Sequence, residues 1–249
     1  MIGVFDSGVG GLSVLRSIRS RLPESDLLYV ADRGRAPYGT RSIDEVESMS
    51  HEIVSWLLDS GSECIVIACN TASAAALESI RRAHPDVPVV GMEPAVKPAA
   101  QSTTSGTVAV FATAVTFQGL LFDSVVSRFA SGVEVLTRAC PSWVEAVERG
   151  DVDSAAVVSD EVSWALDHGA DRIVLACTHF SFLKELIEDV AGIPVIDPAD
   201  AVAAQVGRVA PTRVEGGRTS LAASGDLEEF AALASRLAGI SSPVIPFPA

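Results

Sequence analysis

The fold is decided by a stretch of sequence that occurs twice in the chain. Residues 61–71 read Gly-Ser-Glu-Cys-Ile-Val-Ile-Ala-Cys-Asn-Thr, and residues 169–179 read Gly-Ala-Asp-Arg-Ile-Val-Leu-Ala-Cys-Thr-His. In both copies a run of four apolar residues leads into a cysteine and then into polar residues. The cysteines stand at positions 69 and 177, so the copies are offset by 108 residues. A short apolar run that ends in polar residues is typical of a buried strand.

Three further pairs of short runs repeat at nearly the same offset. At offsets of 106 or 108, residues 4–8, 26–31 and 88–90 correspond to residues 110–114, 134–139 and 194–196. One such agreement could arise by chance, but four in the same order indicate an internal duplication. The sequence therefore predicts two units, each built on the same plan of four strands.

Helical patterns separate these strand candidates. Apolar residues recur at helical spacing within residues 12–22, 46–57 and 157–166. The strand candidates are continuous apolar runs, as expected of a parallel sheet whose two faces are covered by helices. We therefore predict an α/β fold of two pseudo-symmetric domains with largely parallel sheets, and an active site in the cleft between them.

The last fifty residues continue the alternation of helix and strand. A helical run after Asp200 leads to a strand candidate at residues 219–223 and to a helix at about 227–237. The end of the chain, residues 243–249, is rich in proline. We expect it to form a loose tail.

Composition narrows the class of protein. The 249 residues include 18 Lys and Arg against 32 Asp and Glu, so the formal net charge is −14 at pH 7, and 48% of the residues are hydrophobic. This is ample apolar material for a core. Nucleic acids and anionic membranes bind basic surfaces, so we expect neither as a partner. The chain shows no bilayer-length apolar run and no signal peptide, and we expect a cytoplasmic protein.

The cysteines do not indicate a disulfide framework or a metal site. Four cysteines stand at positions 64, 69, 140 and 177, and none forms a Cys-x-x-Cys pair. Cys177 and His179 are the one close pair of possible ligands, and no second pair follows at zinc-finger spacing. We therefore expect no metal.

Chemistry in open α/β sheets gathers beyond the carboxyl ends of the strands, where loops lead into helix N-termini. The residues that follow the predicted strands are 6–8, 32, 69–71, 113–116, 140–141 and 177–179. They are rich in small hydroxyl residues, which, with backbone N–H groups, suit a carboxylate or a phosphate. A thiol at a helix start is expected to have its pKa lowered from about 8.5 toward neutrality.

The glycine-rich segment at the end of the first strand allows two interpretations. Residues 6–11 read Asp-Ser-Gly-Val-Gly-Gly, which is similar to a dinucleotide-binding loop with Asp32 as the ribose acid. The third glycine position of that fingerprint is Ser13, so the match is incomplete. A structural turn explains the glycines equally well. Asp6 is different, because a carboxylate that ends an apolar strand needs a partner or a function.

Cys69 and Cys177 occupy the same place in the two repeats. A lone free cysteine usually packs in the core, which is the interpretation we keep for Cys64 and Cys140. If the two units face each other about a pseudo-two-fold axis, Cys69 and Cys177 approach one cleft from opposite sides. His179, two residues beyond Cys177, could hold a proton or position a ligand.

Two opposed thiols suit the inversion of a stereocentre that bears a C–H bond. That reaction needs a base on one face to remove the proton and an acid on the other face to return one. The two lysines, Lys97 and Lys184, do not stand at strand ends, where a pyridoxal Schiff base would need one. The sequence therefore favours proton transfer without a cofactor.

On these motifs the chain resembles the glutamate racemases of the cofactor-independent aspartate/glutamate racemase superfamily. The matching segments are residues 5–12, 37–39, 68–74, 93–94, 139–141 and 177–179, which span nearly the whole chain. The resemblance implies an isomerase that interconverts L- and D-glutamate and supplies this D-amino acid for peptidoglycan, and so for cell wall biogenesis and cell shape. It implies no cofactor, glutamate as the small-molecule partner, and a homodimer.

The resemblance also implies roles for individual residues. Cys69 and Cys177 would be the catalytic acid/bases, assisted by Asp6, His179 and Glu148. The residues that would bind the substrate are Asp6, Ser7, Pro37, Tyr38, Gly39, Asn70, Thr71, Thr113, Thr116, Thr178 and His179. The implied first domain comprises residues 1–95 plus 206–249, with residues 96–205 inserted as the second.

Several residues depart from the usual pattern of these racemases. Arg33 stands where a small hydroxyl residue is common, and the other departures include Ala95, Ala112, Ser142 and Ser181. Both thiols are retained, but the side-chain pocket could differ. The alternatives are an aspartate or broad-specificity acidic amino-acid racemase, or a catalytically weak relative that binds an amino acid.

Overall fold

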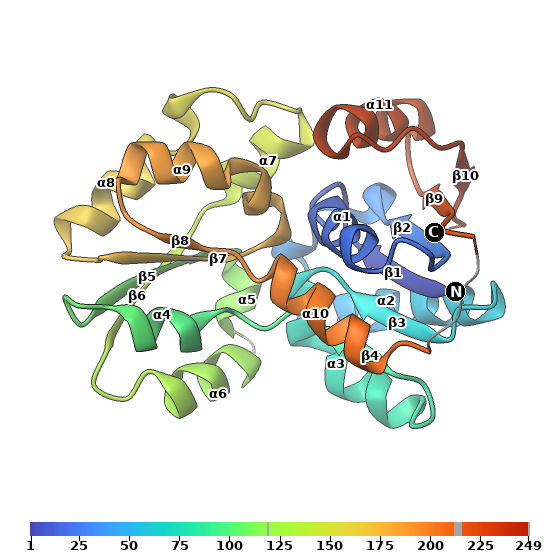
Figure 1. Ribbon diagram of the computed structural model, residues 1–249, viewed down its shortest axis with the longest axis horizontal. Coiled ribbons are helices and arrows are strands. Elements are labelled where there is room, and N and C mark those ends of the chain that lie inside the picture. The colour runs from blue at the N-terminus through green and yellow to red at the C-terminus, as the bar shows by residue number, and fades with distance from the viewer. Residues whose placement is uncertain (119, 212–215, 249) are drawn as a thin grey trace.

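A computed structural model describes residues 1–118, 120–211 and 216–248, and within these ranges the chain forms two sheets whose paired strands are all parallel. Figure 1 shows them in two lobes, with both chain termini in the lobe that holds the larger sheet. The six-stranded sheet has the order β10-β9-β2-β1-β3-β4. Its strands are β1 (Ile2–Asp6), β2 (Leu27–Ala31), β3 (Cys64–Ile67), β4 (Val89–Gly91), β9 (Thr219–Ala223) and β10 (Val244–Pro246).

The four-stranded sheet has the order β6-β5-β7-β8. Its strands are β5 (Thr107–Ala112), β6 (Glu134–Ala139), β7 (Arg172–Ala176) and β8 (Val195–Ile196). The order β2-β1-β3-β4 in the larger sheet is repeated as β6-β5-β7-β8 in the smaller one. The predicted duplication and the predicted α/β class are therefore confirmed.

Helices connect the strands and cover both sheets. The α-helices of the described residues are α1 (Leu12–Arg21), α2 (Ile43–Asp59), α3 (Asn70–Ala83), α4 (Val96–Ser102), α5 (Ala114–Gln118), α6 (Leu120–Phe129), α7 (Pro141–Glu148), α8 (Ser159–Asp167), α9 (Lys184–Ala191), α10 (Ala199–Val209) and α11 (Leu227–Ala238). Short 3-10 helices are η1 (Arg33–Arg35), η2 (Tyr38–Thr40), η3 (Ala155–Val157) and η4 (Thr178–Leu183). None of the described helices is long and apolar enough to cross a membrane.

Local sequence explains where several helices begin and end. Ser42 and Glu45 form a capping box at the start of α2, because each side chain bonds the backbone N–H of the other residue. Asp226 caps α11 in a similar way by accepting from two backbone N–H groups of its first turn. Gly239 ends α11 in the left-handed conformation that glycine adopts without strain.

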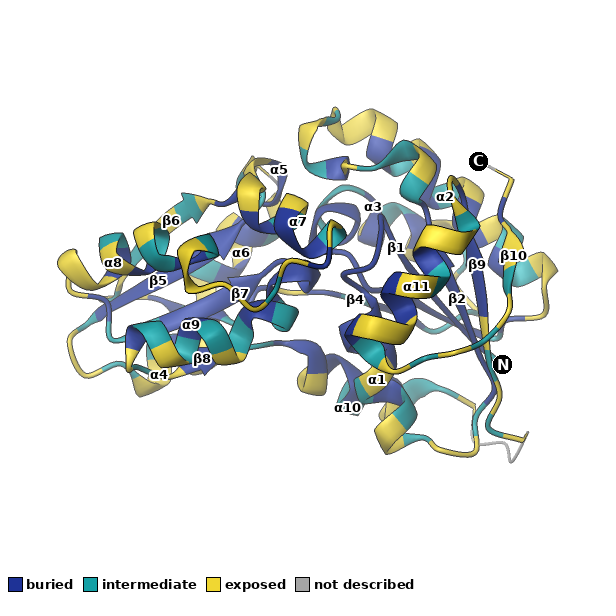
Figure 2. Ribbon diagram, turned by 90° about the horizontal axis from the view of Figure 1, so that it is seen from above, coloured by how far each residue is buried: buried dark blue, intermediate teal, exposed yellow. Residues whose placement is uncertain are grey.

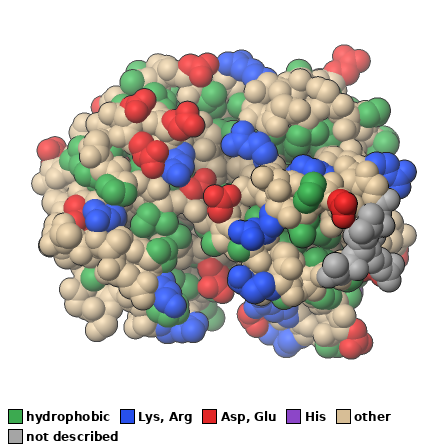
Figure 3. Space-filling model, in the orientation of Figure 1, with side chains coloured by type: hydrophobic (Ala, Val, Ile, Leu, Met, Phe, Trp, Pro, Cys, Tyr) green, Lys and Arg blue, Asp and Glu red, His purple; other side chains and the backbone are tan. Residues whose placement is uncertain are grey.

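Strands β1, β3 and β5 are fully buried (Figure 2). One core cluster extends through both lobes, from Tyr29 stacked on Phe230 to Trp143 packed edge-on between Phe111 and Phe180. This shared core holds the two sheets in a fixed relation, so the loops at their carboxyl ends meet. On the face in Figure 3, acidic and basic side chains are interspersed.

Two expectations from the sequence are wrong. The end of the chain is not a loose tail, because residues 244–246 form β10 beside β9 and the ring of Phe247 packs edge-on against Trp56. Ala249 lies outside the described residues. The run that forms β6 is not buried on both faces, because β6 is the edge strand of its sheet and part of it is exposed.

The predicted domain boundaries stay a proposal. The strands β9 and β10 pair with β2 in the six-stranded sheet, as an inserted second domain requires. The proposed boundary between residues 205 and 206 divides α10, which packs along α1. We therefore propose that the inserted domain ends before α10, near residue 198, because a helix is seldom divided between two domains.

Candidate active site

A cavity of about 250 Å3 opens between the two sheets, beyond the carboxyl ends of their strands. It is lined by eleven of the residues that the sequence predicts for the site: Ser7, Pro37, Tyr38, Gly39, Cys69, Asn70, Thr71, Thr113, Cys177, Thr178 and His179. Both sheets contribute, so the cleft exists because the two lobes face each other. The predicted residues Asp6, Glu148 and Thr116 do not line the cavity but bond to residues that do.

Six lining residues were not predicted as site residues: Thr40, Ala114, Ala139, Pro141, Val144 and Glu145. Ala139 and Pro141 belong to a segment that supports the family resemblance, so that segment was the available signal. Val144 and Glu145 are on α7, and which face of this helix meets the cavity depends on tertiary packing.

Cys69 follows β3 and forms the N-cap of α3. Its sulfur accepts the backbone N–H of Ala72 at 3.4 Å and lies 3.9 Å from the hydroxyl oxygen of Ser7. Burial and, to a lesser extent, the nearby Asp6 carboxylate raise the pKa of the Cys69 thiol to about 12, and the Ala72 N–H opposes this only in part. The expectation that the helix start would lower this pKa is therefore wrong, because desolvation outweighs the helix.

Cys177 follows β7. Its side chain is the first of three that contact one another in turn, the others being His179 and Glu148. Its sulfur lies 3.8 Å from Nδ1 of His179, and Nε2 of His179 lies 2.7 Å from Oε1 of Glu148. Burial alone would lower the pKa of His179, but its bonds to Cys177 and Glu148 raise it well above its usual value. Burial alone would raise the pKa of Glu148, but His179, the Val9 N–H and Arg33 lower it to about 2. These contacts therefore favour a protonated imidazole at His179 beside the Glu148 carboxylate.

Asp6 links the two lobes beneath the cavity. It is fully buried, and its two oxygens accept hydrogen bonds from the backbone N–H of Gly8 at 2.8 Å and from the hydroxyl of Thr178 at 2.9 Å. Burial raises its pKa, although the charge of His179 and these two bonds act in the opposite direction. The sequence indicates that this carboxylate needs a partner or a function, and the structure supplies two partners, one from each lobe.

Neutral polar groups line the side of the cavity between α3 and α5. The hydroxyl oxygens of Thr71 and Thr113 lie 2.9 Å apart, and those of Thr113 and Thr116 lie 3.0 Å apart. Asn70 is 3% exposed, and neither atom of its side-chain amide has a hydrogen-bond partner among the described residues. A buried amide without partners is costly unless a ligand satisfies it.

Asp32 supports Tyr38 from behind the cavity. The Tyr38 hydroxyl donates to Asp32, and the other oxygen of Asp32 accepts from Ser224 at 2.8 Å. Arg35 donates to the same carboxylate at 2.7 Å. Because these bonds satisfy Asp32, they fix the Tyr38 ring at the wall of the cavity.

The glycines of residues 8–11 are explained by close packing between the lobes. A Cβ on Gly8 would lie 2.0 Å from Oε1 of Glu148, and one on Gly10 would lie 2.4 Å from Nδ1 of His179. The loop is buried against these side chains, which leaves no room for a pyrophosphate. The structural interpretation of the glycines is therefore the right one, and the dinucleotide alternative is wrong.

The remaining cysteines, Cys64 and Cys140, are not among the residues that line the cavity. Cys64 is within β3, and Cys140 precedes α7 with its sulfur 3.6 Å from the carbonyl oxygen of Arg138. Both are buried, and burial raises the pKa of each thiol. Among the described residues, no group of three or more His, Cys, Asp or Glu side chains could hold a metal ion.

Comparison with known proteins places this geometry among racemases. The profile of the Asp/Glu/Hydantoin racemase family matches residues 2–206. The chain is 46% identical over 248 residues to the glutamate racemase of Roseiflexus sp. (strain RS-1), covering 95% of this chain and 91% of that relative. It is 49% identical over 212 residues to the glutamate racemase of Methylococcus capsulatus, covering 83% and 78%.

A solved structure agrees with the fold. The crystal structure of Escherichia coli glutamate racemase in complex with L-glutamate and the activator UDP-MurNAc-Ala superposes with a TM-score of 0.88 at 29% identity, covering 98% of this chain and 96% of that one. The agreement over both lobes shows that the two-lobed α/β arrangement is the one those enzymes use.

Proposed function

The chain belongs to the Asp/Glu/Hydantoin racemase family, and we propose that it is a glutamate racemase in which Cys69 and Cys177 exchange protons with the α-carbon of glutamate. It is an isomerase of the amino-acid racemase class, like its curated relatives. The observation that carries the mechanism is the placement of two thiols at the ends of the equivalent strands β3 and β7, both lining one cavity.

The two thiols differ in a way that suits one direction of the reaction. Cys69 is a protonated thiol at neutral pH because burial raises its pKa to about 12. The Cys177 sulfur lies 3.8 Å from Nδ1 of His179, which is placed to exchange a proton with it. The Cys177 thiolate would remove the α-proton, and the Cys69 thiol would deliver a proton to the opposite face.

The reverse direction follows from the same groups. After one turnover Cys177 carries the captured proton and Cys69 is the thiolate, so the enzyme is set to accept the other enantiomer. Asp6 raises the pKa of Cys69, and so makes its thiolate the stronger base. We propose that Asp6 assists Cys69, that His179 assists Cys177, and that Glu148 holds His179 in place.

We assign the recognition of the substrate carboxylates mainly to uncharged donors. The described residues that line the cavity include no lysine or arginine. We propose that the carboxylates of glutamate are bound by hydroxyl, amide and backbone N–H groups, including the helix start at Asn70. The proposed substrate-binding residues are Asp6, Ser7, Pro37, Tyr38, Gly39, Asn70, Thr71, Thr113, Thr116, Thr178 and His179.

Three wider roles belong to the same proposal. D-glutamate made by this enzyme would supply peptidoglycan synthesis, the enzyme would act in the cytoplasm, and two copies would form a homodimer. Light scattering of the purified chain tests the last of these, and a mass of one chain at working concentration contradicts it.

The function is tested by following optical activity with L-glutamate, D-glutamate and L-aspartate as separate substrates, without added cofactor and after dialysis against a strong chelator. We expect both glutamate enantiomers to reach the same racemic end point, with activity unaffected by the chelator. Faster turnover of aspartate would favour the alternative of an aspartate or broad-specificity racemase. Binding of glutamate without turnover would identify a catalytically weak relative.

A further inference from the structure

Arg33 extends the polar chain that starts at Cys177. Its Nε lies 3.2 Å from Oε2 of Glu148, and its Nη1 lies 3.1 Å from Oε2 of Glu229. The other oxygen of Glu148 bonds His179. Five side chains therefore follow one another from the protein surface to the cavity, in the order Glu229, Arg33, Glu148, His179 and Cys177.

The two lobes contribute different parts of this chain. Glu229 is on α11 and Arg33 on η1, both beside the six-stranded sheet, whereas Glu148 is on α7 and His179 on η4, beside the four-stranded sheet. The Arg33 side chain is only 13% exposed and that of Glu148 is 21% exposed. A guanidinium held between two carboxylates at this depth is fixed in direction, because its planar fork can bond both.

The two carboxylate oxygens of Glu148 contact different partners. Oε1 accepts from the Val9 N–H at 2.9 Å and meets His179 at 2.7 Å, while Oε2 meets Arg33. Without Arg33, Oε2 would lose its ion pair, and the Val9 N–H would be the remaining contact that fixes the carboxylate apart from His179 itself. The carboxylate, and with it the angle of the His179 ring to Cys177, would be held less firmly.

We propose that Arg33 is a positioning residue for the Cys177 side of the reaction: it holds Glu148 so that Glu148 orients His179 against the Cys177 thiol. The inference rests on the proposed two-thiol function. Arg33 does not line the catalytic cavity, so the substrate does not meet it there.

The expected effect is selective for one thiol. In Arg33→Ser, we expect kcat to fall about tenfold, less than the 10²–10⁴-fold contribution of an acid–base group because Arg33 acts through Glu148 and His179, with KM within about twofold of the wild type. The rate at which iodoacetamide alkylates Cys177 at neutral pH should fall by a similar factor. The alkylation of Cys69, read by mass spectrometry in the same sample, should stay within about twofold.

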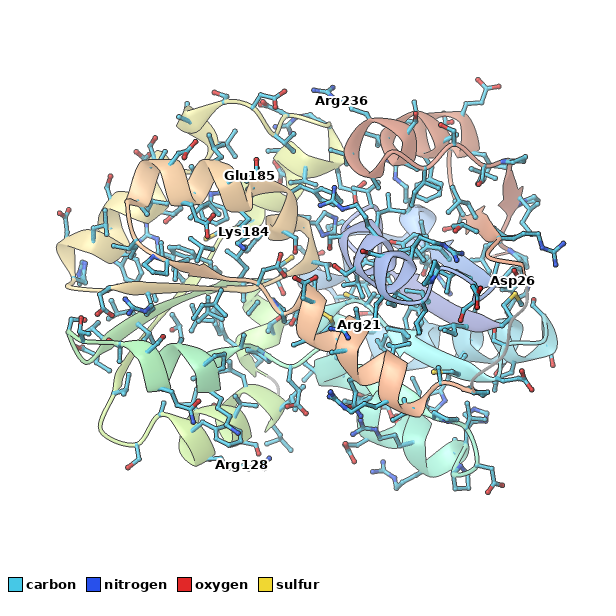
Figure 4. All side chains as sticks on the ribbon, in the orientation of Figure 1. Arg21, Asp26, Arg128, Lys184, Glu185 and Arg236 are labelled. Atoms are coloured by element: carbon cyan, nitrogen blue, oxygen red, sulfur yellow. The ribbon has the colours of Figure 1, made fainter. Side chains whose placement is uncertain are left out.

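Two further variants separate positioning from general stability. Arg33→Lys should recover part of the loss, since an ammonium is a point charge that cannot bond both carboxylates in fixed geometry. The matched control is Arg236→Ser, because Arg236 reaches from α11 toward Asp153 at 3.7 Å, also between the lobes but outside the polar chain (Figure 4). This control should leave kcat and both alkylation rates unchanged.

Each outcome has a defined meaning. A folded Arg33→Ser variant with wild-type alkylation of Cys177 overturns the inference, and so does equal slowing of both thiols. If Arg33→Ser does not fold, Arg33→Lys decides, and wild-type values for that variant overturn the inference. An inactive wild type whose Cys177 alone slows on loss of Arg33 would contradict the proposed function and leave this inference standing.

Discussion

His179 stands between Cys177 and Glu148, with Nδ1 3.8 Å from the sulfur and Nε2 2.7 Å from Oε1. Among the described residues no imidazole contacts Cys69, whose sulfur has the Ser7 hydroxyl and the Ala72 N–H as its neighbours and whose pKa is raised in part by the nearby Asp6 carboxylate. The two thiols thus occupy equivalent places in a duplicated fold but differ in their partners. The Cys177 sulfur alone of the two therefore has an imidazole within reach.

Each cysteine should be essential on its own. Cys69→Ala or Cys177→Ala should lower kcat by a factor of about 10² to 10⁴ or more in both directions, because each thiol serves one face of the α-carbon. The rate is measured by optical rotation or by coupled assay of each enantiomer. Cys64→Ala is the matched control, since Cys64 is buried in β3 away from the cavity. A near-native rate in either active-site variant would contradict the two-thiol assignment.

Turnover of L-glutamate in D₂O should label the product before the substrate. The delivering thiol equilibrates with solvent before the substrate arrives, so every inverted molecule gains deuterium. A molecule that reverts usually regains its own proton, because the capturing thiol lies in a closed cavity and exchanges slowly. Mass spectrometry early in the reaction should therefore find deuterated D-glutamate and protiated L-glutamate. Substantial protium in early product would indicate one base serving both faces.

The stability that Glu148→Gln loses relative to the wild type should depend on pH. The raised pKa of His179 means that its contribution is complete below its usual value of 6.5 and is lost as pH rises through the raised value. The pKa of Glu148 is lowered to about 2 from 4.5, so its contribution is complete above 4.5 and is lost as pH falls toward 2. The pair therefore contributes most between about pH 4.5 and 6.5.

Urea unfolding at several pH values measures this window. The difference in free energy of unfolding between wild type and Glu148→Gln should be largest near pH 5.5, smaller at pH 3, and smaller again once the pH exceeds the raised pKa of His179. The same variant should lower kcat, because His179 loses the carboxylate that orients it. A difference that does not vary with pH would show that the pair is not charged in the folded state.

Gly10 should not tolerate a side chain. In Gly10→Ala the added methyl would lie 2.4 Å from Nδ1 of His179 and 2.6 Å from Oγ1 of Thr178, so both groups must move. We expect a loss of about 1–3 kcal/mol in stability and of about 10²-fold in kcat/KM. Gly207→Ala on α10 is the control, because its nearest neighbour would be 3.4 Å away. It should be neutral or stabilising by up to about 1 kcal/mol.

Much of the fold could be predicted from sequence because its signals are local. The apolar runs of β1, β3, β5 and β7, and the polar residues that end them, are readable from a few adjacent positions. The repeat at an offset of about one hundred residues related Cys69 to Cys177 and so identified the reactive pair. The prediction failed at the C-terminal tail, because β10 forms only when β9 is present as an edge to pair with.

By itself, the sequence determined the two-unit parallel plan and the residue types at the strand ends. Only the tertiary structure decided how those residues act on one another. Glu148 accepts hydrogen bonds from the Val9 N–H, which is 139 residues away in the sequence, and from Arg33, which is 115 residues away. Burial, not the helix start, sets the pKa of Cys69. The physical reason is that hydrophobic periodicity is encoded between neighbours, whereas desolvation and ion pairing depend on which surfaces meet when the two sheets pack.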